Sequence, residues 1–210
     1  SIIVYQHGAR VAEHHWEPET RRIQYSATKS FTSTAVGIAV KEGLLSLDER
    51  VVDCFPDDLP AEPSEHLQQM IVRDLLTMSM GHDAGYLMAE QRPFMPETDW
   101  VKYALALPLA YAPGTHFTYD NCGPYIAGIL VQRRAGCDLV DYLMPRLFCP
   151  LGIQTPTWET DLQRFSFGSS GLFITVSELA KLGLLYLQDG RWNGRQIVTA
   201  EWAREATRKQ

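Results

Sequence analysis

The sequence predicts an α+β fold in which an antiparallel sheet is flanked by helices and carries an inserted helical subdomain. Three observations support it: a strand pattern opens the chain, helical periodicity dominates the middle, and no repeat, low-complexity tract or linker divides the chain. With 210 residues, 45% of them hydrophobic, the chain can bury a substantial core. We therefore expect residues 1–210 to form a single domain, with the helical subdomain at about 45–165.

The N-terminus predicts a β-hairpin. A strand pattern runs from Ile2 to Gln6, the pair His7-Gly8 is a turn signal, and a second strand pattern runs from Arg10 to His14. We expect the main sheet to begin with these two strands.

The first helix is predicted from Ser26 to about Glu42. Phe31, Ala35 and Ile38 recur at helical spacing without an interrupting proline, and Gly43 is a stop signal. We expect this helix to be largely buried and to pack on the sheet.

A second helical pattern runs from Ser64 to Met80, and residues 81–98 then lose all periodicity. We expect residues 81–98 to be a long exposed loop of the kind that rims a binding site. Four later segments fit short helices: Trp100–Leu107, Pro124–Arg134, Leu139–Leu147 and Ser177–Gln188.

Composition narrows the possible partners. The net charge is −6, and the 19 Lys and Arg form no basic stripe, which argues against nucleic acid. The longest uncharged stretch, Tyr103–Tyr119, is broken by Pro108 and Pro113, so no membrane span is expected. We expect a small-molecule or peptide-like partner.

Metal and compartment signals are weak. The four cysteines contain no C-x-x-C pair and no histidine at ligand spacing, which indicates core thiols and no metal site. His14 and His15 would bind a metal only if carboxylates converged on them, and His82 and His116 are expected to be solvated loop histidines. Residues 1–5 lack a signal-peptide pattern, but a processed chain would lack it too, so a cytoplasmic and a periplasmic or extracellular location both stay open.

Ser26 and Lys29 place a hydroxyl and an amine three residues apart at a predicted helix start, where the two side chains share a face. A lysine desolvated by apolar neighbours loses its proton more easily and can activate a serine nucleophile. Backbone N–H groups at the helix start can stabilise an oxyanion. Alone, this short motif arises easily by chance.

Tyr119 and Asn121 form a second polar pair, after the Pro113-Gly114 turn and before a predicted helix. A tyrosine in such a position is often a core residue with a solvated hydroxyl. Beside a cationic lysine, however, its phenol can lose a proton and act as an acid or base.

Five longer segments carry a resemblance to a known family: Tyr25–Phe31, Glu42–Asp48, Val72–Met78, Pro113–Asn121 and Pro150–Ile153. In them the chain resembles the serine β-lactamase and penicillin-binding-protein superfamily, and within it the class C branch. That branch includes class C β-lactamases, DD-peptidase-like proteins, family VIII esterases and hydrolases of nylon-type amide oligomers. The similarity covers nearly the whole chain.

The resemblance implies a β-lactamase/transpeptidase-like fold and an acyl-transfer hydrolase that needs no cofactor. It implies Ser26 as the nucleophile, Lys29 as the base, Tyr119 as the proton relay and Asn121 as the amide that orients substrate. The substrate bond is an amide or ester of β-lactam, peptide or small-ester type.

The chain departs from the family pattern at three places. Where many relatives have H-x-S-G, it has Met78-Ser-Met-Gly81. Asp120 stands where relatives commonly have Ser or Ala, which could add charge near the cleft. A third motif of K-T-G or H-x-G type, expected beyond the region of Trp202, is absent along with later strands. We expect one of three explanations: the chain is a fragment, another chain supplies the missing part, or the ordered part of the protein ends at this point. The alternative function is a non-catalytic penicillin-binding-like sensor or scaffold.

Overall fold

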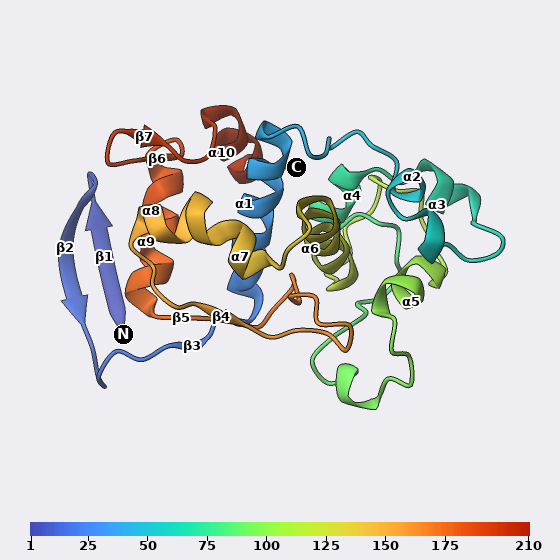
Figure 1. Cartoon of the computed structure of the whole chain (residues 1–210), viewed down its shortest axis with the longest axis horizontal. Coiled ribbons are helices and arrows are strands. Elements are labelled where there is room, and N and C mark those ends of the chain that lie inside the picture. The colour runs from blue at the N-terminus through green and yellow to red at the C-terminus, as the bar shows by residue number, and fades with distance from the viewer.

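A computed structural model describes all residues, 1–210. Figure 1 shows an elongated molecule with a two-stranded hairpin at one end and short helices at the other. Between them the long helices α1 (Thr28–Lys41) and α6 (Cys122–Ala135) lie side by side. No helix is long and apolar enough to cross a membrane.

The remaining helices are short, apart from α9. In chain order they are α2 (Val51–Cys54), α3 (Glu65–Gln69), α4 (Val72–Leu76), α5 (Trp100–Ala106), α7 (Leu139–Leu143), α8 (Cys149–Leu151), α9 (Val176–Leu187) and α10 (Ala200–Thr207). Three 3₁₀ turns cover Tyr25–Ala27, Pro56–Asp58 and Arg92–Phe94, and a π-helical turn covers Met144–Phe148.

The predicted hairpin is confirmed as β1 (Ile2–Gln6) and β2 (Ala9–His14), which pair antiparallel. It does not start the main sheet, and this expectation was wrong. The pair forms a sheet of its own, because β2 is exposed along its whole length and β1 packs against α9.

A three-stranded antiparallel sheet lies near the start of α1. It consists of β3 (Arg22–Ile23), β5 (Leu172–Ile174) and β4 (Thr157–Trp158), with β5 in the middle. A third small sheet joins β6 (Arg191–Trp192) to β7 (Arg195–Gln196). Helix α1 contacts β5 near its N-terminus, where the Leu172 N–H donates to Thr28 Oγ1, and it packs mainly on α6 and α7.

Helix α6 is the centre of the core. Its side chains are buried without interruption from Cys122 to Gln132, as expected for a helix that is covered on every side. Gly136 ends it in the left-handed conformation that favours glycine, at φ +69°.

The single helix predicted from Ser64 to Met80 was wrong, because the chain breaks it into α3 and α4. Met70 and Ile71 are extended, and the Met70 carbonyl accepts from the Val51 N–H at 2.9 Å. Asp74 then accepts from the Ile71 N–H at 2.9 Å and starts a new helix. Pairing with a distant segment therefore overrides the helical periodicity.

The segment 81–98 is irregular, as predicted, but it is not wholly exposed. His82 and Leu87 are buried, because the segment turns inward to pack against the start of α6. The Asn121 N–H donates to the Tyr86 carbonyl, and Asn121 Nδ2 donates to the Leu87 carbonyl. The cysteines also vary: Cys122 is buried, Cys54 and Cys137 are half-buried, and Cys149 is exposed rather than a core thiol.

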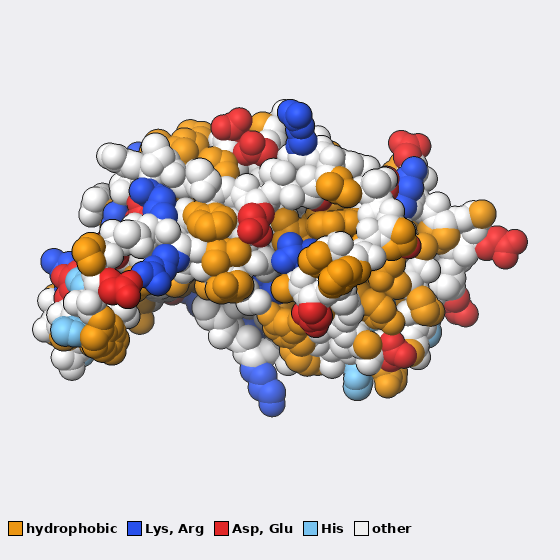
Figure 2. Space-filling model, turned by 90° about the horizontal axis from the view of Figure 1, so that it is seen from below, with side chains coloured by type: hydrophobic (Ala, Val, Ile, Leu, Met, Phe, Trp, Pro, Cys, Tyr) orange, Lys and Arg blue, Asp and Glu red, His pale blue; other side chains and the backbone are white.

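The surface seen from below carries Lys and Arg side chains scattered among Asp and Glu, with hydrophobic groups between them (Figure 2). This face shows no stripe of positive charge.

Replacing Gly123 with alanine is expected to lower the free energy of unfolding by about 1–3 kcal/mol, the usual cost of overpacking a core. A Cβ at this position would lie 2.3 Å from the Leu75 carbonyl oxygen, a backbone atom of α4 that cannot rotate away. Urea unfolding would measure the loss. The matched control is Gly183→Ala in α9, where a Cβ meets nothing within 4 Å and alanine should stabilise the helix by ~0.5–1 kcal/mol. An unchanged stability for Gly123→Ala would contradict the close packing of α4 on α6.

Candidate active site

Ser26 lies in the 3₁₀ turn that leads directly into α1. Tyr25, the residue before it, has a left-handed φ of +43°, which is unusual for a residue with a side chain. Ser26 is exposed, so its hydroxyl can meet a substrate.

Lys29 lies one turn further along, and its amine faces three oxygens. Nζ lies 3.2 Å from Ser26 Oγ, 2.7 Å from Asn121 Oδ1 and 2.8 Å from the Ser169 carbonyl oxygen. Asn121 Oδ1 and the Ser169 carbonyl can only accept, so they take two N–H bonds of the amine. In a neutral amine the remaining lone pair then faces Ser26 Oγ.

Tyr119 reaches Ser26 from the segment that precedes helix α6. Its Oη donates to Ser26 Oγ at 2.5 Å, and Lys29 Nζ lies 5.2 Å from the centre of its ring. Asn121 is buried two residues further on, held by the Leu87 carbonyl at 3.0 Å. The structure thus brings together all four residues that the sequence singled out, from segments more than 90 positions apart.

Ser169 is a member of this group that sequence reasoning missed as a site residue. Its Oγ donates to the Asn121 carbonyl at 2.5 Å, while its own carbonyl accepts from Lys29. The neighbouring Gly168 makes this approach possible, since a Cβ there would lie 2.6 Å from the Pro124 carbonyl oxygen. The Gly168-Ser-Ser-Gly171 run was its only signal in the sequence.

The surroundings lower the pKa of both Lys29 and Tyr119. Desolvation lowers the pKa of Lys29 below its ordinary value; the nearby Tyr119 and Asp120 oppose this, and the positive charge of Arg92 adds to it. Burial alone would raise the pKa of Tyr119, but its bond to Ser26 and the Lys29 charge together lower it. Both shifts favour proton exchange closer to neutral pH.

Arg92→Gln is expected to move the acidic limb of kcat/KM to higher pH. The Arg92 guanidinium, stacked 4.4 Å from the centre of the Phe167 ring, lowers the pKa of Lys29, so its removal raises that pKa and keeps Lys29 protonated to higher pH. A pH–rate profile on an ester substrate would measure the shift. Arg10→Gln, which removes an equal charge from the exposed strand β2, is the control and should leave the limb in place. A limb that moves to lower pH would exclude Lys29 as the group that titrates.

His82 contradicts the expectation of a solvated loop histidine. It is 1% exposed, and its Nδ1 is hydrogen-bonded to Asp120 Oδ2. The Asp120 carboxylate therefore points into the interior and not toward solvent. Sequence reasoning missed this pair because the two residues lie 38 positions apart.

The other histidines of the sequence analysis lie outside the site. His15 bonds Glu13 and Ser1 on the hairpin, His14 contacts the Trp16 ring edge to face, and His116 stacks on Tyr111. The one group of side chains close enough to share a metal ion is His82, Asp120 and Cys122, whose donor atoms lie within 4.8 Å of one another.

The comparisons with known proteins agree with the fold. The Beta-lactamase family model matches residues 1–210, and the chain belongs to that family. Over 96% of its length the chain superposes on a putative β-lactamase from Bacteroides dorei, with a TM-score of 0.78 and 22% identity, covering 61% of that chain. The predicted β-lactamase/transpeptidase-like α+β fold is confirmed.

Two curated relatives have hydrolase names. Lovastatin esterase of Penicillium rubens is 31% identical over 212 residues, covering 75% of this chain and 52% of the esterase. D-aminopeptidase of Brucella canis is 27% identical over 179 residues, covering 79% of this chain and 34% of the aminopeptidase. The chain thus spans about half the length of the first relative and about a third of the second.

Proposed function

We propose that this protein is a serine hydrolase that cleaves amide or ester bonds through an acyl-enzyme on Ser26. The observation that carries the proposal is the double contact of Ser26 Oγ, with Tyr119 Oη at 2.5 Å and Lys29 Nζ at 3.2 Å. A serine hydroxyl needs a neighbour to take its proton before it can attack a carbonyl, and here two candidates touch it. The family relatives named esterase and aminopeptidase support the choice of bond.

In the proposed mechanism, neutral Lys29 takes the Ser26 proton as Oγ attacks the substrate carbonyl carbon. The Asn121 and Ser169 oxygens hold the amine so that its lone pair faces Oγ. Tyr119 gives its proton to the leaving group and regains one from Lys29, which leaves the acyl group on Ser26. Water then releases the acyl group by the reverse proton transfers.

Asn121 is assigned to the substrate side of the site as well as to Lys29. Its Oδ1 accepts from Lys29 Nζ at 2.7 Å, and the same amine lies 3.2 Å from Ser26 Oγ. We propose that the polar edge of the substrate aligns against this amide.

The proposal is tested with the protein at its full natural length. It is incubated with a fluorophosphonate and with a fluorescent penicillin, digested and examined by mass spectrometry. We expect the phosphonyl adduct on Ser26, and heat-denatured protein serves as the control. No adduct on Ser26 with either reagent would overturn the proposal. A stable adduct or complex without turnover of any ester or amide would favour the sensor or scaffold alternative.

A further inference from the structure

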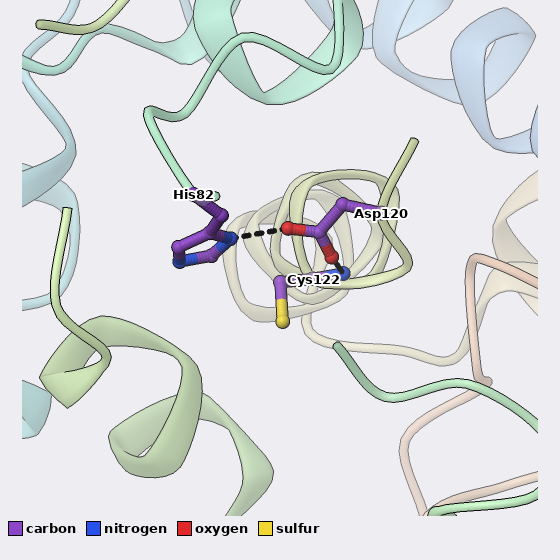
Figure 3. Close-up of side chains that lie close together, drawn as sticks. All are labelled: His82, Asp120 and Cys122. Carbon is purple, nitrogen blue, oxygen red and sulfur yellow. Dashed lines mark hydrogen bonds and ion pairs between the residues drawn. The ribbon is translucent and has the colours of Figure 1, made fainter. Parts of the chain in front are cut away.

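A buried hydrogen-bonded pair, His82 and Asp120, adjoins the segment that carries Tyr119 and Asn121. Asp120 stands between these two residues in the sequence and is 3% exposed. Its carboxylate points into the interior, toward His82. Figure 3 shows the imidazole and the carboxylate pointing at each other beside the start of α6. The mechanism proposed above uses neither side chain.

Hydrogen bonds to residues 78–82 hold the chain on both sides of Tyr119, and the His82–Asp120 contact is the one formed by two side chains. Asp120 Oδ1 accepts from the Cys122 N–H at 2.5 Å, at the first residue of α6. The carbonyl of His82 accepts from Thr118 Oγ1 at 2.6 Å, and the Thr118 N–H donates to the Met78 carbonyl at 3.0 Å. The segment that carries the phenol and the amide is therefore tied to residues 78–82 before and after Tyr119.

The bonding of His82 indicates how the pair is protonated. Its Nε2 is buried and has no hydrogen-bond partner. An imidazolium would bury an unpaired N–H and its charge, so a neutral ring with the proton on Nδ1 costs less. The Nδ1–H then donates to the Asp120 carboxylate. This bond and the bond from the Cys122 N–H stabilise the buried charge of the carboxylate.

We propose that the His82–Asp120 pair is a positioning device for the active site. It holds the Thr118–Cys122 segment so that Tyr119 Oη stays on Ser26 Oγ and Asn121 Oδ1 stays on Lys29 Nζ. This inference rests on the proposed function, because its effect is measured on the reaction of Ser26. A misplacement of reacting groups by about 1 Å can cost about 10²-fold in rate, so a firm tether of this loop matters.

A metal ion bound by His82, Asp120 and Cys122 is the competing interpretation. Two observations favour the hydrogen-bonded pair: both Asp120 oxygens already accept hydrogen bonds, and in Figure 3 the unpartnered nitrogen of His82 points away from the carboxylate. Metal analysis of the purified protein decides between them.

The experiment compares His82→Leu, Asp120→Ser and the double variant with the natural protein at its full length. Fluorophosphonate labelling gives two separate quantities, the rate constant for modification of Ser26 and the final fraction of protein labelled. We expect each single variant to slow the rate constant by about 10- to 100-fold. The double variant should be no slower than the singles, because residues that act as one unit lose their effect together. The melting temperature of the double variant should exceed that of His82→Leu, since the double variant no longer buries an unpaired carboxylate.

Tyr125→Phe is the matched control, because it removes a buried hydrogen bond of 2.6 Å to the carboxylate of Asp161 without touching the tethered segment. It should lower the melting temperature and leave the labelling rate constant unchanged. The positioning role is overturned by any of three results. The first is a smaller labelled fraction at the natural rate constant in the singles. The second is a loss that multiplies in the double variant. The third is one equivalent of zinc that is present in the natural protein and vanishes in both singles. If the natural protein itself is not labelled, the proposed function fails first, and that result is distinct from all three.

Discussion

Ser26→Ala is expected to abolish turnover of ester and amide substrates, with a loss of about 10⁴-fold or more. No other hydroxyl replaces the nucleophile, because Tyr119 Oη and Lys29 Nζ both converge on Ser26 Oγ. Ser26 is exposed, so its truncation should leave the fold and its melting temperature almost unchanged. Steady-state hydrolysis of a nitrophenyl ester and of an anilide would measure the loss.

Ser33→Ala is the control for this prediction. Ser33 lies on the same helix, is half-buried and makes no hydrogen bond through its side chain. It should keep natural rates on both substrates. Turnover that survives in Ser26→Ala and disappears on chemical blocking of another residue would place the nucleophile elsewhere.

The second large effect concerns which group takes the Ser26 proton. Lys29→Ala is expected to remove acylation almost entirely, because it deletes the amine whose lone pair faces Ser26 Oγ and leaves Asn121 Oδ1 without its donor. Lys41→Ala, at the exposed end of the same helix, is the control and should label at the natural rate.

Tyr119→Phe separates the two roles, since it keeps the ring and deletes only the hydroxyl. An amine leaves poorly without a proton, whereas a nitrophenolate leaves unaided. We therefore expect the anilide to slow by about 10²- to 10⁴-fold and the acylation by the nitrophenyl ester to slow much less. Pre-steady-state bursts on the two substrates would measure the difference. Equal losses on both substrates would show that Tyr119, and not Lys29, takes the proton of Ser26. The comparison is needed because Tyr119 Oη lies closer to Ser26 Oγ, at 2.5 Å, than Lys29 Nζ does, at 3.2 Å.

The segments predicted correctly depend on local interactions. The hairpin follows from a β-prone run before a His7-Gly8 turn, and helix α6 follows from an apolar run closed by Gly136. The failed helix from Ser64 to Met80 shows the limit of this reasoning. Its periodicity is real, but the backbone of Met70 and Ile71 pairs with Arg50 and Val51, a contact that no local pattern reveals.

The sequence by itself determined that Ser26 and Lys29 meet, because residues three apart on a helix share one face whatever surrounds them. It also set Tyr119 and Asn121 apart as a polar pair before α6. Only the tertiary structure decided that Tyr119 reaches Ser26 and Asn121 reaches Lys29. It also decided that the Ser169 carbonyl completes the contacts of Lys29 and that Asp120 turns inward to His82. These contacts join segments 38 to 140 positions apart. Their geometry is set by the packing of α1, α6 and the Gly168 turn, where a single added Cβ would not fit, and not by any local conformational preference.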